Sequence, residues 1–140
     1  MIWRLCAIVL ATYALHLAWE MGQGYLFAPM ERLPFWTATA WCARAAGWDV
    51  VISAAAYFAA ALAGRRILWA ERRASWPLAI YFSAGLGVTI AIERWAISAG
   101  RWQYREAMPT IAGIGLTPLL QWIAVSAAIL VLVRWAHKDV

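Results

Sequence analysis

Four long apolar stretches constrain this chain more than any other feature of its sequence. They cover residues 2–24, 46–63, 76–97 and 117–136, and each approaches the roughly 20 helical residues that cross a bilayer core. Lipid offers the backbone no hydrogen-bond partners, so spanning segments are helices or closed barrels. Runs such as AIVLA and AAILVLV lack the alternation of barrel strands. The sequence therefore predicts an all-α polytopic membrane protein with a bundle of four transmembrane helices.

Composition and length agree with this fold class. Of the 140 residues, 65% are hydrophobic and 14% are charged, whereas soluble domains are roughly half apolar and about a quarter charged. The length suits one domain and leaves no room for a separate soluble catalytic module. We therefore expect residues 1–140 to form a single transmembrane domain.

The net charge of +5 is interpreted as a signal of orientation, and no nucleic-acid partner is expected from it. With four spans, both termini and the second loop share one side of the membrane. That loop carries a compact cluster formed by Arg65, Arg66, Arg72 and Arg73. Cytoplasmic loops are enriched in Lys and Arg, so the cluster predicts an inner-membrane protein with cytoplasmic N- and C-termini.

Tryptophan is unusually abundant, with 11 copies in the chain. Amphipathic indole rings collect at membrane interfaces, and Trp3, Trp69, Trp76 and Trp135 are expected at the cytoplasmic one. The remaining tryptophans fall near the opposite interface, which exceeds what anchoring requires. Some of them are therefore expected to line a pocket or cover an interfacial lid.

Polar side chains gather at the outer end of the predicted bundle. His16 and Glu20 are four residues apart and share a helix face, and Gln23 follows a turn later. Asp49 lies near the start of the second span and Glu93 near the end of the third. The same end holds further candidates for binding a ligand or partner, namely Arg44, Arg94, Trp102, Tyr104, Gln121 and Trp122.

Two interpretations of these polar residues stay open. Ionisable groups in or beside a span are costly and suggest function, which makes four of them catalytic candidates for proton transfer in a polar pocket: His16, Glu20, Asp49 and Glu93. Alternatively, the same groups pair with arginines across the helices and only stabilise the bundle. The chain has 2 histidines and lacks the Glu-x-x-His pairs of di-iron bundles. No metal and no cofactor are expected.

The third loop, residues 100–109, reads GRWQYREAMP and alternates aromatic and basic side chains. It is interpreted as a lid or a loop that binds a headgroup, or as a re-entrant segment that Trp and Tyr anchor at the interface.

Longer strings give a family resemblance. HLAWEMGQGYLF, WCARAAGWDV and WQYREAMPTIAGIGLTPLLQW, with Glu93 closing the third span, resemble small uncharacterised bacterial four-span integral membrane proteins over nearly the whole chain. The resemblance implies the same fold and brings no catalytic residues. A fainter similarity to carotenoid-cyclase membrane domains lies in the Trp-x-Tyr element and the acidic helix ends. Residues 118–121 read PLLQ where those domains carry a proline followed by paired glutamates.

Three functions fit these features. The favoured one is an accessory membrane protein that contacts membrane lipids, a second copy or another protein through Ala/Gly helix faces at 54–56, 59–61 and 83–87. The alternative is an enzyme that acts on a lipid or isoprenoid by carboxylate acid/base chemistry. A weaker third is an oligomer that conducts protons or solutes. Nucleotide-binding, Ser-His-Asp and zinc-finger signatures are missing from the sequence.

Overall fold

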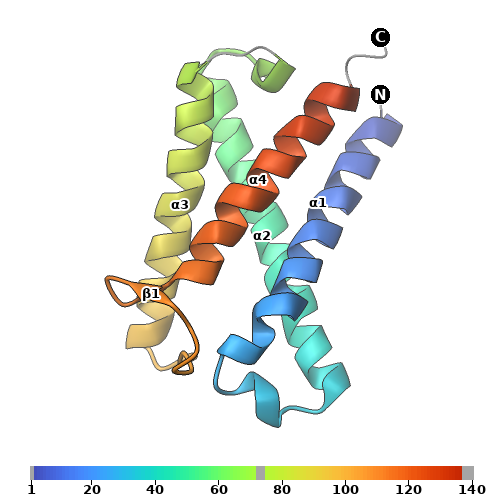
Figure 1. The fold of residues 1–140 in the computed structure, drawn as a ribbon. Coiled ribbons are helices and arrows are strands. Elements are labelled where there is room, and N and C mark those ends of the chain that lie inside the picture. The colour runs from blue at the N-terminus through green and yellow to red at the C-terminus, as the bar shows by residue number, and fades with distance from the viewer. Residues whose placement is uncertain (1, 72–74, 137–140) are drawn as a thin grey trace.

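The computed structural model describes residues 2–71 and 75–136 and shows an all-α bundle (Figure 1). Its long helices are α1 (Ile2–Gln23), α2 (Phe35–Ala63), α3 (Ser75–Ser98) and α4 (Leu116–Ala136). Short 3-10 helices are η1 (Gly24–Leu26), η2 (Met30–Arg32) and η3 (Trp69–Glu71). One small antiparallel hairpin joins β1 (Thr110–Ile111) to β2 (Ile114–Gly115). The predicted fold class is confirmed.

All four long helices are apolar and long enough to cross a membrane. Large apolar side chains point outward along the bundle, as shown by Leu10, Leu62 and Val131, which are 67%, 80% and 63% exposed. Helices that are apolar on all sides suit a lipid environment. The outer surface of the bundle thus matches the lipid contact expected from the sequence.

The bundle has two distinct ends (Figure 1). The terminal end holds the start of α1, the end of α4 and residues 64–71, while the loop end holds residues 24–34 and 99–115. This is the arrangement of four consecutive spans. In the predicted basic cluster, Arg65 and Arg66 follow the end of α2, and Arg72 and Arg73 lie outside the described residues.

Helix α2 differs from its predicted bounds, because it begins at Phe35 rather than near residue 46. The added turns contain threonines and Arg44, which lower hydropathy without stopping a helix. Pro34 precedes them, and proline is tolerated where a helix begins. Cys42 and Arg44 therefore lie on α2 and not in a loop, and Asp49, which was expected near the start of this span, lies in the middle of the helix.

Aromatic packing forms a core that extends from the terminal end to the middle of the bundle. The rings of Trp69, Tyr81 and Trp122 pack in sequence, with centroid distances of 5.6 Å for both neighbouring pairs. A Cβ on Gly85 would lie 1.6 Å from the Trp122 ring, so only glycine permits this approach. Trp69 and Trp122 are 2% and 3% exposed. The ring of Trp69, which was expected at the cytoplasmic interface, is therefore enclosed between helices at the terminal end and is not exposed on the surface.

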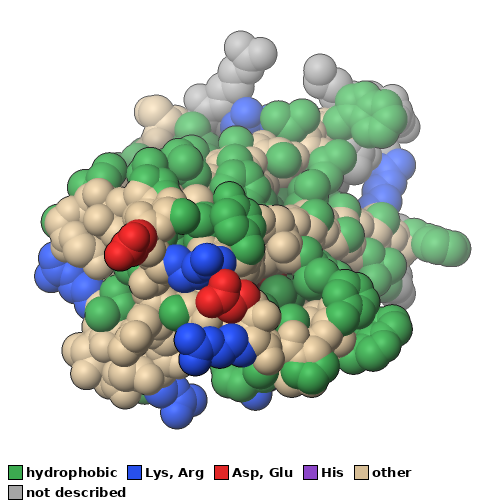
Figure 2. Space-filling model, turned by 60° about the horizontal axis from the view of Figure 1, so that its bottom comes forward, with side chains coloured by type: hydrophobic (Ala, Val, Ile, Leu, Met, Phe, Trp, Pro, Cys, Tyr) green, Lys and Arg blue, Asp and Glu red, His purple; other side chains and the backbone are tan. Residues whose placement is uncertain are grey.

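The loop end is tied together by backbone hydrogen bonds between its two connections. Ala28 N donates to Gln103 O at 3.0 Å, and Arg105 N donates to Leu26 O at 2.9 Å. An exposed ion pair joins Arg105 and Glu31 at 2.8 Å. Figure 2 shows basic and acidic side chains gathered on this end, bordered by hydrophobic ones.

Candidate functional site

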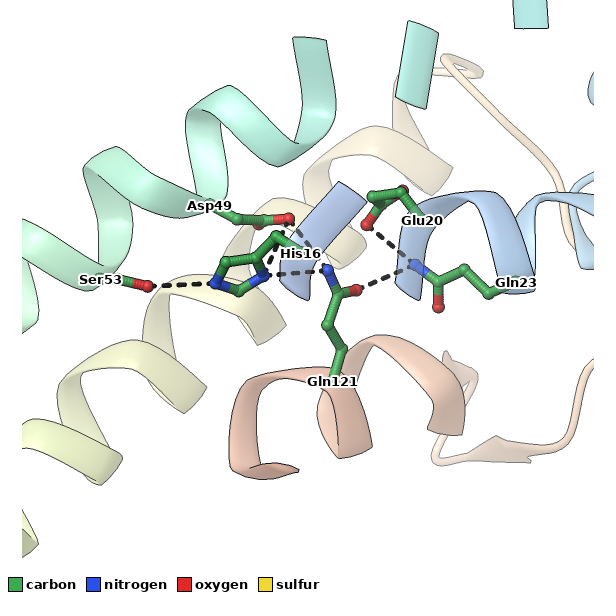
Figure 3. A network of polar contacts seen from close by, with 6 residues as sticks. All are labelled: His16, Glu20, Gln23, Asp49, Ser53 and Gln121. Carbon is green, nitrogen blue, oxygen red and sulfur yellow. Dashed lines mark hydrogen bonds and ion pairs between the residues drawn. The ribbon is translucent and has the colours of Figure 1, made fainter. Parts of the chain in front are cut away.

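His16 on α1 is the centre of the candidate site and is only 1% exposed. Its Nε2 lies 3.3 Å from Ser53 Oγ, and its Nδ1 lies 3.2 Å from Gln121 Nε2 (Figure 3). Asp49 Oδ2 is 3.6 Å from the same Nδ1. Asp49 and Ser53 are four residues apart, so α2 presents both on one face. Helices α1, α2 and α4 thus bring polar groups together around a single imidazole.

Two buried glutamines extend these contacts toward the loop end (Figure 3). Gln23 Nε2 donates to Glu20 Oε1 and to Gln121 Oε1, both at 2.9 Å. Gln121 Nε2 donates to Asp49 Oδ2 at 3.0 Å. We call this connected group the His16 network, which comprises His16, Glu20, Gln23, Asp49, Ser53 and Gln121.

The hydrogen bonds of Gln121 assign the tautomer of His16. Because Gln121 Oε1 accepts from Gln23, the amide nitrogen of Gln121 faces both Asp49 and His16 Nδ1. An amide nitrogen only donates, so Nδ1 accepts a hydrogen bond and carries no proton. The proton lies on Nε2, which donates to Ser53 Oγ. His16 is neutral in this arrangement.

Glu93 on α3 forms a second polar centre beneath the third loop. It is 7% exposed, and its Oε2 accepts hydrogen bonds from Trp102 Nε1 at 3.4 Å and from the Tyr104 hydroxyl. Burial first, and then the hydrogen bond to Glu93, raise the pKa of Tyr104 above its ordinary value. The Tyr104 hydroxyl therefore keeps its proton and remains a donor.

The two centres are electrostatically one cluster. The carboxyl groups of Glu20, Asp49 and Glu93 repel one another when they are ionised. No metal site relieves this repulsion, because the described ranges 2–71 and 75–136 contain no group of three or more His, Cys, Asp or Glu side chains that could hold an ion. Amide and indole donors are the partners that the protein supplies.

The predicted arginines lie apart from this cluster. Arg44 is exposed, and its guanidinium lies over the Trp41 ring at 4.6 Å. Arg94 is also exposed. Within the described part of the chain, the ion-pair contacts are His16–Asp49 and Arg105–Glu31. Of the structural alternative raised from the sequence, pairing of the acids with Arg44 or Arg94 is not shown, whereas His16 and Asp49 do pair across α1 and α2.

A surface hollow of about 180 Å³ opens at the loop end near the network. It is lined by residues that follow Glu20 and Gln23 in the chain and by the early part of α2, namely Met21, Gly24, Tyr25, Met30, Glu31, Ala38 and Cys42. Cys42 Sγ contacts Glu20 O at 3.6 Å. Its walls are mostly apolar, as a site for a lipid requires.

Most residues predicted for the site come together, with two kinds of exception. Trp122 belongs to the core, where its Nε1 donates to Phe82 O at 3.2 Å, and the two arginines are on the surface. Ser53 was missed, although its four-residue spacing from Asp49 is a signal that the sequence contains.

No model of a known protein family, no curated protein and no solved structure matches this chain. The chemistry of the site's own side chains is therefore the basis for its function. It offers carboxylates, a neutral imidazole and amide groups at one end of an apolar bundle. Such groups bind a polar ligand or exchange protons with it.

Proposed function

We propose that this chain is a multi-pass inner-membrane protein that binds the polar end of a membrane lipid in the His16 network. Both termini are cytoplasmic in this proposal, and the network lies near the outer leaflet. The carrying observation is a cluster of three carboxyl groups, with Glu93 buried and Glu20 and Asp49 half-buried, to which the described residues supply no arginine or lysine. These groups accept hydrogen bonds but have no counter-charge, which makes their burial costly when they are ionised, and a bound ligand can offset that cost.

The surroundings of the network favour a ligand that arrives from the membrane. Asp49 is the accessible member, with a side chain 27% exposed, while His16 is enclosed. Trp48, which precedes Asp49 in the chain, is 65% exposed. A lipid whose polar end meets Asp49 can lie along the apolar surfaces of α1 and α2.

Orientation rests on the positive-inside rule. Arg65 and Arg66 lie at the terminal end, and the sequence adds Arg72 and Arg73 to the same connection. Cytoplasmic placement of these cations puts the loop end outside. The bacterial origin suggested by the family resemblance belongs to the same proposal, as does an accessory role beside another membrane protein or a second copy.

A second candidate function is an enzyme that acts on a lipid or isoprenoid. The observation that favours it is the contact of His16 Nδ1 with Asp49 Oδ2 at 3.6 Å, because a carboxyl group beside an imidazole can pass a proton to a substrate. Gln121 lies between these groups and donates to both. Asp49, the more exposed of the two, is then the group that meets the substrate.

Lipid retention tests the proposed function. The wild-type protein and a Glu20→Gln variant are purified in mild detergent, and the lipids they retain are identified by mass spectrometry. The wild type should keep a lipid enriched over its share in the source membrane, and Glu20→Gln should lose that enrichment. Glu106→Gln, an exposed loop carboxyl, is the matched control and should behave as wild type. Equal, unselective retention by all three proteins would contradict lipid binding at the network.

A fusion experiment tests the orientation separately. A reporter that is active only in the periplasm, attached after residue 140, should give no signal. A strong signal would place the terminal end outside and move the network to the cytoplasmic leaflet.

A further inference from the structure

Every amide hydrogen in the His16 network is already used within the protein. Gln23 Nε2 gives one hydrogen to Glu20 and one to Gln121. Gln121 Nε2 gives one to Asp49 and one to His16. The imidazole proton of His16 goes to Ser53. A ligand therefore finds no amide or imidazole donor free in this network.

Acceptors, by contrast, remain unused. Gln23 is 5% exposed, and its Oε1 is a buried atom with no hydrogen-bond partner among the described residues. Turning this amide over would set its oxygen against the oxygens of Glu20 and Gln121, so the orientation is fixed by its neighbours. An ionised carboxylate also offers about four lone-pair sites, more than the amides fill at Glu20 and Asp49.

The charge of the site points the same way. Glu20, Asp49 and Glu93 are carboxyl groups that can pair with a cation, and His16 is neutral in the observed tautomer. The nearest predicted cations are engaged or exposed elsewhere, since Arg44 covers Trp41 and Arg105 pairs with Glu31. Nothing in the network matches an anionic phosphate.

We infer that the His16 network binds a primary ammonium group, carried either by an ethanolamine phospholipid or by a soluble amine. The inference rests on the proposed function for its lipid source. An ammonium supplies up to three hydrogens and one positive charge, which are what the orphan Gln23 oxygen and the repelling carboxyl groups lack. A trimethylammonium carries the same charge without hydrogens, so it leaves that oxygen unpaired.

A headgroup series on the wild-type protein tests this without any substitution. Delipidated protein in mild detergent is titrated with phosphatidylethanolamine, phosphatidylcholine and phosphatidylglycerol of the same acyl chains, and bound lipid is counted by native mass spectrometry. Hydrogen bonds to charged groups contribute enough that phosphatidylethanolamine should bind about tenfold more tightly than phosphatidylcholine. Phosphatidylglycerol, which has no cation, should bind more weakly than phosphatidylethanolamine.

A variant pair locates the binding. Glu20→Gln should remove the preference for phosphatidylethanolamine, and Glu106→Gln should retain it. Circular dichroism at each titration temperature verifies that both variants are folded. If folded Glu20→Gln keeps the preference, or if Glu20→Gln does not fold and the wild type shows no preference, the inference is overturned.

The outcomes separate the inference from the proposed function. Equal binding of phosphatidylethanolamine and phosphatidylcholine, lost in Glu20→Gln, would overturn the ammonium and leave lipid binding intact. Ethanolamine alone, when it displaces the lipid at similar concentration or binds where no lipid does, would support the ammonium and assign it to a soluble source. Binding of none of these probes would overturn both.

Discussion

The two ends of this bundle are built from different chemistry. From the terminal end to the middle of the bundle, Trp69, Tyr81 and Trp122 fill the core, and Gly85 lets an indole ring lie directly on the backbone of α3. Toward the loop end, the same helices enclose acids, amides and an imidazole. Packing accounts for the first arrangement, whereas the second places mutually repelling carboxyl groups where apolar residues would pack without cost. Under the proposed function, the aromatic end stabilises the fold and the polar end serves a ligand.

Gly85→Ala should give the largest effect and tests the aromatic end. The added methyl group meets the Trp122 ring, and overpacking of this kind costs about 1–3 kcal/mol. Unfolding of the detergent-solubilised protein in a denaturing detergent measures the loss. Gly87→Ala is the matched control, because nothing lies within 4 Å of its new Cβ. Equal stability of the two variants would mean that the indole does not rest on Gly85.

Glu20→Gln should act in the opposite direction at the polar end. Removing one of three carboxyl groups that repel one another when ionised should stabilise the lipid-free protein by about 0.5–2 kcal/mol, the common range for a stabilising substitution. The same unfolding assay compares it with Glu106→Gln, which should not change. A loss as large as that of Gly85→Ala would show that the network is structural and would remove the contrast between the ends.

Tyr104→Phe tests the contact between the third loop and Glu93. Loss of the hydrogen bond to Glu93 should cost about 1 kcal/mol at neutral pH. Tyr25→Phe, with a side chain 62% exposed, is the control and should cost less.

The same hydroxyl predicts a pH dependence. The pKa of Tyr104 is raised above its ordinary value of 10.0, so the folded protein binds its proton more tightly than the unfolded chain. This contribution to stability is complete below about pH 10 and is lost as the pH rises toward the folded pKa. Stability of the wild type should therefore fall above pH 10 more steeply than that of Tyr104→Phe. Parallel curves would contradict the contact with Glu93.

The ion pair of Arg105 and Glu31 should have the smallest effect. Both side chains are partly exposed, at 41% and 44%, and such pairs contribute about 0–1 kcal/mol. A double-mutant cycle with Arg105→Ala and Glu31→Ala measures the coupling. A coupling well above 1 kcal/mol would show that this surface contact fastens the loop end.

Hydropathy was sufficient to predict the fold, because helices in lipid must be long and apolar. Three of the four predicted spans differ from their helices by a single residue at either end, and α2 alone extends further. The grouping of His16, Glu20, Gln23, Asp49 and Gln121 followed from spacing and helix direction. Residue spacing and helix direction stay the same when the predicted ends of a span are wrong by a few residues.

The features that the sequence did not predict, which are the places of Trp122, the arginines and Ser53, depend on how each helix is rotated about its axis. Hydropathy carries no such information when apolar residues surround the helix. Trp122 follows Gln121 directly, yet one side chain enters the core and the other the network. The arginines were expected to pair with the acids, but Arg44 and Arg94 face outward. The contact of Ser53 with His16 depends on how α1 and α2 are aligned along their axes, and the sequence does not give that alignment.

The central claim is that the His16 network is a ligand site, and retained lipid in matched variants tests it most directly. Native mass spectrometry of wild type, Glu20→Gln and Glu106→Gln, purified in parallel, measures that lipid. We predict that the wild type and Glu106→Gln selectively retain one amine-bearing lipid. A folded Glu20→Gln should lose it. The same lipid profile on all three folded proteins would contradict the claim.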